Sequence, residues 1–310
     1  MRSSFVRQNL FPLLAALIWG TAFVAQSVGA DYVGAFTFNA ARAAIAFLFL
    51  LGLLGLRHVF RKRRGEARPA GSRRDLMIGG LCCGAALTVA SFLQQKGLET
   101  TTSGKAGFIT ALYIVLVPVL GLLLGRRAPR AVWLGLVLAV AGLYCLCING
   151  EMRITTGDFY VLACAFCFAI QILTVDHFSQ RVDGVALSCA QFFVMTVLSS
   201  LGVLLEPLPD MALASVWLPP VLYVGVFSSG VAYTLQILAQ RDSDPTVVSL
   251  LLSMESVFAT IAGALILGDR MSGREYFGCV LMLAAVVLAQ MPHPAGRKAF
   301  GGGQEGQPML

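Results

Sequence analysis

Charged side chains are scarce in this sequence. Of its 310 residues, 57% are hydrophobic and only 13% are Asp, Glu, Lys or Arg. Soluble globular domains carry roughly a quarter charged residues, and a single soluble core of this apolarity would leave too little polar surface to stay dissolved. The deficit predicts a chain whose surface mostly faces lipid.

Metal-binding side chains are also few or badly placed for the purpose. The three histidines, His58, His177 and His293, fall near predicted span ends or in the tail, which argues against a membrane-buried histidine site. All eight cysteines lie in apolar runs, whereas disulfide or metal frameworks place cysteines in loops with polar neighbours. Cys164 and Cys167 form a CxxC pair on a predicted helix, but buried packing explains them better than redox or metal chemistry. We expect no bound metal or cofactor.

Long apolar runs dominate what remains. A bilayer core is crossed by roughly 20 apolar residues, and the links between the runs are too short for a separate soluble domain. The sequence therefore predicts an all-α, polytopic membrane bundle of ten transmembrane helices. The Gly-rich, polar residues 292–310 are expected to form a disordered cytoplasmic tail. The predicted spans are approximately residues 11–29, 33–56, 75–97, 102–124, 131–148, 158–178, 185–205, 215–239, 246–267 and 274–291.

The first run also has features of a signal peptide. Arg2 and Arg7 precede it, and Val28-Gly29-Ala30 resembles a cleavage site. Nine further spans follow, and the internal repeat described below needs this run as its first member. A retained transmembrane span is therefore the favoured interpretation.

The distribution of Lys and Arg predicts the orientation. With the N-terminus inside, 17 of the 23 Lys and Arg lie on the inner side, three lie on the outer side and three lie in or at the ends of spans. Because short cytoplasmic loops are enriched in these residues, both termini are predicted to be cytoplasmic, in a membrane that is best read as the bacterial inner (plasma) membrane.

Eight of the basic residues fall between residues 57 and 74. A basic run can indicate nucleic-acid binding. Here it lies between two long apolar runs, which favours a cytoplasmic loop facing anionic lipid headgroups and excludes nucleic acid as the expected partner.

The two halves of the chain share residues at a steady offset. Matches at an offset of 142 or 143 recur in three successive elements, which indicates an internal duplication. We predict a first repeat over residues 1–148 and a second over residues 149–291. The matches pair Ala90, Leu93 and Gln94 with Ala232, Leu235 and Gln236; Leu124-Gly125 with Leu267-Gly268; and Gly135, Val137, Leu138 and Ala141 with Gly278, Val280, Leu281 and Ala284.

Each repeat would contain five spans, an odd number, so the second copy enters the membrane from the opposite face. Inverted repeats are typical of secondary transporters, which bind substrate near the midplane between the halves. A merely structural duplication is the other reading, but a channel or scaffold gains no evident benefit from inversion.

Several segments resemble the EamA-like family of the drug/metabolite transporter superfamily, over about residues 10 to 290. That resemblance implies export or uptake of metabolites, amino acids or drugs. The sequence departs from the family pattern at Ser256, where proline is common, at Asp269, where Glu is usual, and at Cys167-Phe168, near the place of a second Trp-Gly pair. The resembling segments are Leu17 to Thr21 (LIWGT), Arg42, Phe108 to Tyr113 (FITALY) with Pro118, and Leu250 to Phe258 (LLLSMESVF) followed by Leu267-Gly268-Asp269.

Charged residues inside spans are the first candidates for the site, because charge is costly in a membrane. Arg42 has Asn39 one turn before it and is predicted to bind an anionic group such as a substrate carboxylate, or else to be satisfied structurally. Glu255 is predicted to carry protons or contact substrate, since a low-dielectric site favours the neutral carboxyl; pairing with Arg42 or capping a broken helix are the alternatives. Lys105 more simply snorkels to the outer interface than guides anions.

Weaker candidates are polar or aromatic residues within spans. Trp19, Gln94, Tyr113 and Gln236 are predicted to line the substrate cavity. Each of these side chains, like those of Gln191 and Tyr233, has the alternative of bonding a neighbouring helix. No catalytic residue is predicted.

These features favour a secondary transporter, most simply an exporter, of small metabolites, amino acids or drug-like molecules working by alternating access. A flippase for lipid-linked or amphiphilic substrates is the close alternative. A membrane-embedded enzyme is less favoured, because Asp242 and Asp244 form the only close acidic pair. A channel would need a ring or filter that scattered single charges do not supply. The oligomeric state is not predicted.

Overall fold

The computed structural model describes residues 6–64, 72–101, 103–126, 129–147, 155–241, 243–262 and 272–290. Every regular element within these ranges is helical, as the sequence predicts. The predicted tail, residues 292–310, lies outside them. The elements are η1 (Val6–Leu10), α2 (Phe11–Ala30), α3 (Ala35–Arg63), α4 (Arg73–Leu98), α5 (Ser103–Ala111), α6 (Tyr113–Leu123), α7 (Arg130–Cys147), α8 (Thr156–Ser179), α9 (Gly184–Val203), η2 (Met211–Leu213), α10 (Ala214–Tyr223), η3 (Val224–Ala232), α11 (Tyr233–Gln240), α12 (Pro245–Leu252), α13 (Glu255–Ala262) and α14 (Gly273–Gln290).

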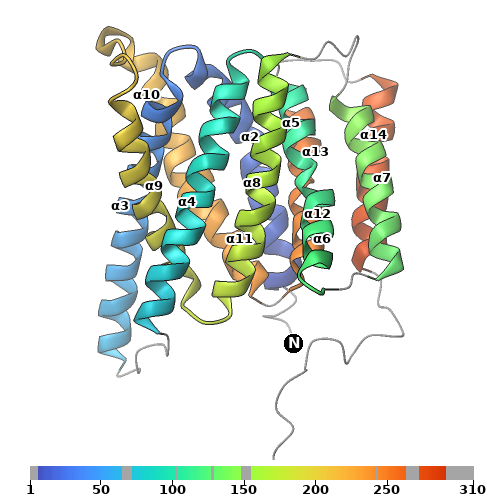
Figure 1. The fold of residues 1–310 in the computed structure, drawn as a ribbon, viewed down its shortest axis with the longest axis horizontal. Coiled ribbons are helices and arrows are strands. Elements are labelled where there is room, and N and C mark those ends of the chain that lie inside the picture. The colour runs from blue at the N-terminus through green and yellow to red at the C-terminus, as the bar shows by residue number, and fades with distance from the viewer. Residues whose placement is uncertain are drawn as a thin grey trace, which may run out of the picture.

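Eight helical stretches of the described chain are long and apolar enough to cross a membrane. A ninth, residues 130–146, is apolar but shorter. The remaining predicted span corresponds to α14, which packs along α7 (Figure 1). The eight stretches are residues 7–30, 35–64, 73–98, 106–123, 156–179, 184–203, 211–240 and 245–262.

The helices stand side by side in one bundle (Figure 1). Helices α3 and α9 pack together at one edge, and α7 and α14 form a pair at the opposite edge. Helices α2, α4, α8 and α11 lie between these pairs, with the short helices α5, α6, α12 and α13 beside them. The interior of the bundle is therefore assembled from segments of both halves of the chain.

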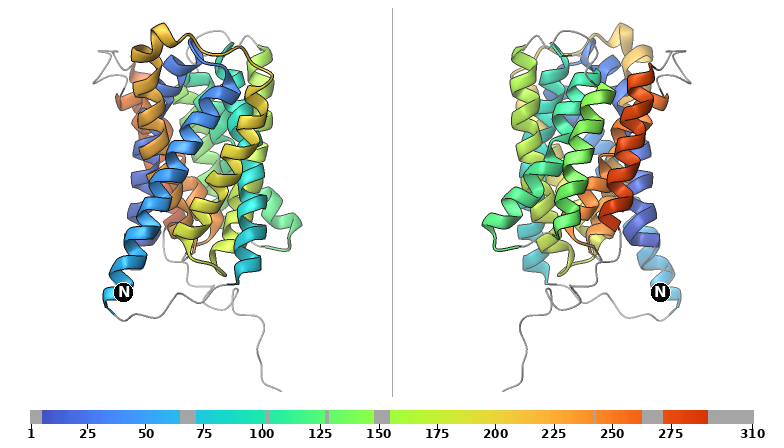
Figure 2. Two further views of the ribbon diagram at one scale, coloured as in Figure 1. Left: turned by 90° about the vertical axis from the view of Figure 1, so that its left-hand side faces the viewer. Right: turned by 90° about the vertical axis from the view of Figure 1, so that its right-hand side faces the viewer.

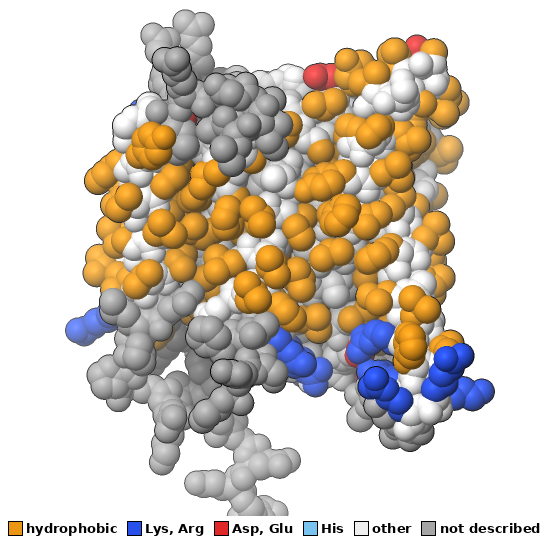
Figure 3. Space-filling model, turned by 180° about the vertical axis from the view of Figure 1, so that it is seen from behind, with side chains coloured by type: hydrophobic (Ala, Val, Ile, Leu, Met, Phe, Trp, Pro, Cys, Tyr) orange, Lys and Arg blue, Asp and Glu red, His pale blue; other side chains and the backbone are white. Residues whose placement is uncertain are grey.

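The surface has an apolar belt bounded by a basic edge, as expected of a protein that faces lipid (Figure 3). A broad apolar belt covers the face seen in Figure 3, and Lys and Arg gather along one edge of it. Many large apolar side chains of the described chain are exposed; Leu48 is 64% exposed and Val137 is 66% exposed. Such contiguous apolar exposure suits contact with hydrocarbon rather than water.

Helix α3 extends beyond the neighbouring helices at the basic edge (Figure 2). Its 29 residues give it a length of about 43 Å, against a hydrocarbon core of about 30 Å. The last turn carries Arg61, Lys62 and Arg63, whose positive charges are stabilised by the negative, C-terminal end of the helix dipole. One turn earlier, Arg57 pairs with Asp183 at 3.3 Å, and the same aspartate caps α9 by accepting from two backbone N–H groups.

Two predicted spans are interrupted near their middle. The predicted span over residues 102–124 is divided at Leu112 between α5 and α6, and the one over residues 246–267 is divided at Ser253 and Met254 between α12 and α13. At the second break the Ser253 hydroxyl donates to the Leu250 carbonyl at 2.7 Å, and Met254 donates its N–H three residues back to Leu251 at 3.2 Å. These tight local bonds compete with the regular helical ladder.

The predicted span over residues 215–239 is also irregular. Pro219 and Pro220 lie in α10, and the nine residues of η3 that follow form a π-helix before α11 begins. Proline removes a ladder hydrogen bond, and π-helical turns are frequent at functional sites. All three irregular segments contribute residues to the central cavity described below.

Glycines set the contact between α7 and α14. A Cβ atom built on Gly142 would lie 2.9 Å from the carbonyl oxygen of Gly278, and one on Gly278 would lie 2.8 Å from that of Gly142. The helices therefore touch backbone to backbone, in the manner of small-residue interfaces in membranes.

We expect Gly142→Ala to lower the thermal unfolding temperature in detergent, because overpacking such a contact costs about 1–3 kcal/mol. Gly52→Ala is the matched control, since a Cβ on Gly52 in α3 meets nothing within 4 Å and gains the same helix propensity. Equal unfolding temperatures for the two variants would contradict the close packing of α7 on α14.

Candidate functional site

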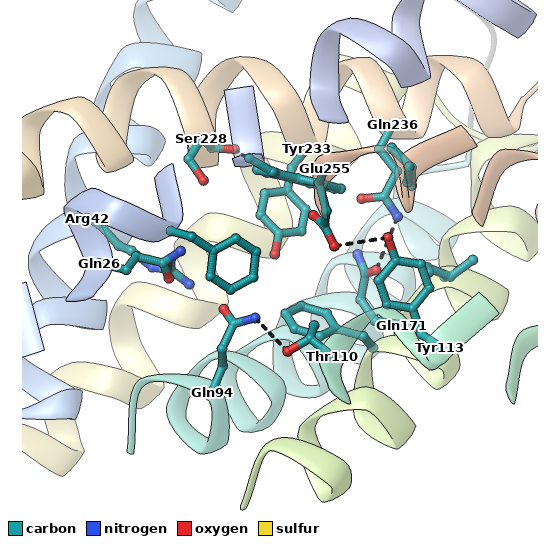
Figure 4. Close-up of a pocket in the computed structure, with 15 residues that line it drawn as sticks. Gln26, Arg42, Gln94, Thr110, Tyr113, Gln171, Ser228, Tyr233, Gln236 and Glu255 are labelled. Carbon is teal, nitrogen blue, oxygen red and sulfur yellow. Dashed lines mark hydrogen bonds between the residues drawn. The ribbon is translucent and has the colours of Figure 1, made fainter. Parts of the chain in front are cut away.

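A small polar cavity lies at the centre of the bundle (Figure 4). Its volume is about 40 Å³, measured as the space open to the centre of a water molecule, which is enough for a few waters and too little for a metabolite. The cavity is therefore narrow in this structure.

The cavity brings together all six predicted site residues. Trp19, Arg42, Gln94, Tyr113, Gln236 and Glu255 line it from helices of both halves. Their placement is observed; their role in binding substrate stays a prediction. Sequence reasoning left out several further lining residues: Phe23, Gln26, Thr110, Phe168, Gln171, Ile172, Ser228 and Leu252.

Arg42 enters the cavity from α3 with little of its hydrogen-bonding capacity used. The side chain is 2% exposed, its Nη1 donates to Gln26 Oε1 at 3.1 Å, and its Nε has no partner. Neither amide atom of the neighbouring, buried Asn39 has a partner either. A buried guanidinium without a carboxylate is costly, and this end of the cavity therefore holds a charge that the described residues leave unneutralised.

Glu255 is the first residue of α13 and lies directly after the break in that span. It is 4% exposed and accepts a hydrogen bond from the Tyr113 hydroxyl at 3.3 Å. Tyr113 is itself the first residue of α6, after the break in the corresponding span of the first half. The two residues are 142 positions apart, which is the offset of the repeat.

Arg42 and Glu255 do not pair with each other. The ion pairs formed by the described residues do not include either of them. Figure 4 shows Arg42 and Gln26 at one end of the cavity and Glu255 and Tyr113 toward the other, with Tyr233 between them. The cavity thus presents a cationic end and a carboxyl end separated by an aromatic ring.

Glutamines continue the polar lining toward α8 and α11. Gln236 donates to Gln171 Oε1 at 3.4 Å, and Gln171 donates to Gln191 Oε1, also at 3.4 Å. On the other side, Gln94 donates to the Thr110 hydroxyl at 3.3 Å. An offset of 145 residues would have drawn attention to Gln26 and Gln171, because Phe23 and Gln26 recur as Phe168 and Gln171.

Trp19 and Gly20 fix one wall. The indole N–H of Trp19 donates to the Ser228 carbonyl of η3 at 3.2 Å, and its ring lies 4.8 Å from that of Tyr233. A Cβ atom on Gly20 would lie 2.6 Å from the Glu255 carbonyl oxygen. Only glycine therefore allows α2 to approach α13 this closely, which gives the Trp-Gly pair a physical reason.

Other candidates lie elsewhere or outside the described residues. Asp244 accepts from the Thr246 N–H at 2.8 Å and caps α12, whereas Asp242 is not described. The side chain of Lys105, residues 65–71 of the basic loop and residues 267–269 also fall outside the described part. Within the described part, no three His, Cys, Asp or Glu side chains gather as a metal site.

Comparison with known proteins adds an independent observation. Residues 7–148 and 155–291 each match the EamA-like transporter family. The chain is 30% identical to an uncharacterized transporter of Archaeoglobus fulgidus, over 90% of this chain and 84% of that one. It is 25% identical to the threonine/homoserine exporter RhtA of Salmonella typhimurium, over 71% and 70% of the two chains. A crystal structure superposes with a TM-score of 0.74 at 19% identity, covering 91% of this chain and 96% of the other, and supports the fold.

The Arg42–Gln26 bond gives a prediction about stability. We expect Gln26→Leu to destabilise the protein by about 2–3 kcal/mol, because a buried guanidinium loses its one hydrogen-bond acceptor. The double variant Gln26→Leu/Arg42→Leu should lose less than the sum of the single losses, since it removes the buried charge as well.

The measurement is thermal or denaturant unfolding in detergent. Gln95→Leu serves as the control, because Gln95 is equally buried and donates to the Gln26 carbonyl but touches no charge. Additive losses in the double variant would show that Gln26 does not support Arg42.

Proposed function

The chain belongs to the EamA-like transporter family, and on that premise we propose that it exports small polar metabolites, amino acids or drug-like molecules by alternating access. Family membership makes the protein an integral membrane transporter and not an enzyme. The direction of transport, the substrate and the mechanism are the proposal. The observation that carries it is a narrow central cavity lined from both halves of the chain by residues at the repeat offset.

The proposed architecture is ten spans in two inverted repeats. In it, α5 with α6, and α12 with α13, are each one broken span, and α10, η3 and α11 together form another. Helix packing supports an exchange of the halves, because corresponding spans make corresponding contacts. The third span, α4, packs on the sixth, α8, and the eighth, α10–η3–α11, packs on the first, α2. The remaining pairs, α3 with α9 and α7 with α14, also join the two halves. Alternating access would follow if the halves exchange conformations around the fixed cavity.

The proposed orientation places both termini in the cytoplasm of a bacterial inner membrane. The basic end of α3 and the arginines Arg126, Arg181 and Arg241 support it, because Lys and Arg favour cytoplasmic loops. The overhang of α3 then lies among lipid headgroups, where its basic last turn attracts anionic lipids.

The proposed substrate carries a carboxylate. Arg42 is buried, forms no ion pair and retains an unpartnered Nε, and a guanidinium binds a carboxylate through two parallel hydrogen bonds. Threonine and homoserine, named for the relative RhtA, are amino acids that carry a carboxylate and are the first to test.

Counterflow in proteoliposomes tests this proposal. Vesicles loaded with a panel of amino acids and small metabolites should accumulate labelled substrate saturably, and Arg42→Ala should reduce the initial rate at least about tenfold, since each 1.4 kcal/mol of lost binding is a factor of ten. Arg42→Lys keeps the positive charge but loses the two parallel N–H donors of the guanidinium, so its initial rate should lie between those of the parent and Arg42→Ala. Gel filtration establishes that each variant is folded.

Absence of exchange across the panel, from folded protein, would overturn the small-metabolite proposal. The next substrates to test would then be lipid-linked and amphiphilic molecules, as expected of a flippase. Flux that is linear in concentration and shows no counterflow would indicate a channel instead.

We further propose that Glu255 couples transport to protons. It is a carboxyl buried in the cavity with one hydroxyl partner, and such groups form proton relays in transporters. Glu255→Gln, which keeps the shape and removes the titration, should leave counterflow at equal pH and abolish the response to an imposed pH gradient. An unchanged response in the variant would exclude Glu255 as the proton carrier.

A further inference from the structure

A second cavity lies at the basic edge of the bundle and is unlike the first. Its volume is about 620 Å³ by the same measure, so it is wide where the central cavity is narrow. It is formed by the ends of α6, α8 and α11 and by the link between α11 and α12. Its lining residues are Arg126, Asp176, Gln180, Arg241, Ser243, Asp244 and Pro245.

The described residues that line this inner cavity carry charges of both signs. Arg126 and Asp176 form an ion pair at 2.6 Å, and the other charged residues of the described lining are Arg241 and Asp244. A lining that offers both cations and anions can contact groups of either sign. It suits a small solute that has both a positive and a negative group, or polar groups with no net charge.

Side-chain amides connect the inner cavity to the central one. Gln236 lines the central cavity and donates to Gln240 Oε1, one turn further along α11, at 3.1 Å. Gln240 in turn donates to the Ile172 carbonyl of α8 at 2.9 Å. At the inner cavity, Gln180 donates to the backbone carbonyls of Gln240 and Arg241 at 3.4 and 2.8 Å.

The amides of Gln236 and Gln240 are buried, and that of Gln236 is incompletely bonded. Gln236 and Gln240 are 1% and 0% exposed, and Gln236 Oε1 has no partner. Burying amides in an apolar bundle costs free energy that apolar side chains of the same size would not cost. An amide both donates and accepts hydrogen bonds, so a row of amides can replace the water around either end of a zwitterion.

The corresponding place in the first half is apolar. At the offset of 142 that relates Gln236 to Gln94, the counterpart of Gln240 is Leu98. Leu98 is buried against Ala106 and Val161. The amide row is therefore a property of one half of the chain and is not imposed by the repeat.

We propose that the inner cavity is the cytoplasmic vestibule of the transporter and that Gln240 is the gate residue between this vestibule and the central site. The vestibule receives small zwitterionic or polar uncharged solutes, and the side chain of Gln240 moves aside as they pass to Gln236 and the central cavity. This inference rests on the proposed transport function. It adds the route by which the central site is reached from the cytoplasm.

Cysteine accessibility tests the route without knowledge of the substrate. The probe is a hydrophilic, membrane-impermeant methanethiosulfonate reagent, applied to Gln240→Cys from the cytoplasmic side in inverted vesicles or from the outer side in whole cells. Labelling of the unmodified chain supplies the background from its own cysteines. We expect labelling at least about tenfold faster from the cytoplasmic side, because transient inward opening exposes position 240 to that side alone.

Matched positions control for general loosening. Ser243→Cys, at the vestibule, should label from the cytoplasmic side, whereas Gln95→Cys, an equally buried glutamine that lines neither cavity, should not. If Gln240→Cys does not fold, Gln236→Cys takes its place and should label from the cytoplasmic side faster than Gln95→Cys. A folded variant that labels no faster than Gln95→Cys would overturn the route.

Transport kinetics separate this inference from the proposed function. Gln240→Leu introduces the side chain that Leu98 has at the corresponding position of the first half. With a substrate that shows counterflow, this variant should lower the initial rate about five- to tenfold, while the half-saturation concentration stays within about twofold. Gln95→Leu should transport at the parent rate. Counterflow without cytoplasmic labelling of position 240 would reject the gate and keep the transporter; labelling without counterflow would keep the gate and reject the substrate class.

Discussion

The cost of placing an arginine and a carboxyl group inside a lipid-embedded bundle is the constraint on which the rest of this structure depends. Lipid cannot solvate Arg42 or Glu255, so their partners must come from the chain itself or from the small cavity that they line. Gln26 and Tyr113 supply one hydrogen bond each. The polar side chains that are costly elsewhere in a membrane therefore gather around these two groups, and the apolar side chains are left to face outward.

Irregular backbone follows from the same constraint. The breaks before Tyr113 and Glu255 and the π-helix η3 interrupt the regular α-helical hydrogen-bond pattern near the cavity. In η3 the Ser228 carbonyl also accepts a hydrogen bond from Trp19. Non-helical backbone is tolerated at membrane depth only where protein or a cavity surrounds it, and in the described chain these segments all border the central cavity.

Much of this arrangement could be predicted from the sequence. Hydropathy locates a span because lipid demands about 20 apolar residues in a row, and the cost of charge singles out Arg42 and Glu255 against that background. The break at Leu112 escaped prediction, and the one at Ser253 entered only as an alternative role for Glu255, because neither break changes the hydropathy and the second depends on a hydroxyl competing for a carbonyl. Gln26 and Gln171 were missed because a glutamine in a span is as consistent with helix packing as with a cavity. Only the shape of the bundle distinguishes these cases.

The chain has three tryptophans, and the position of one of them has an optical consequence. Trp133 lies on α7 and Trp217 on α10, where its indole donates to the Asp210 carbonyl. Trp19 alone borders the central cavity, in contact with Tyr233 and held by Ser228. Since indole emission responds to polarity and to nearby hydrogen bonds, the native fluorescence of the protein contains a component that originates at the cavity wall. The molecule therefore carries its own spectroscopic probe of the state of that cavity, with no label attached.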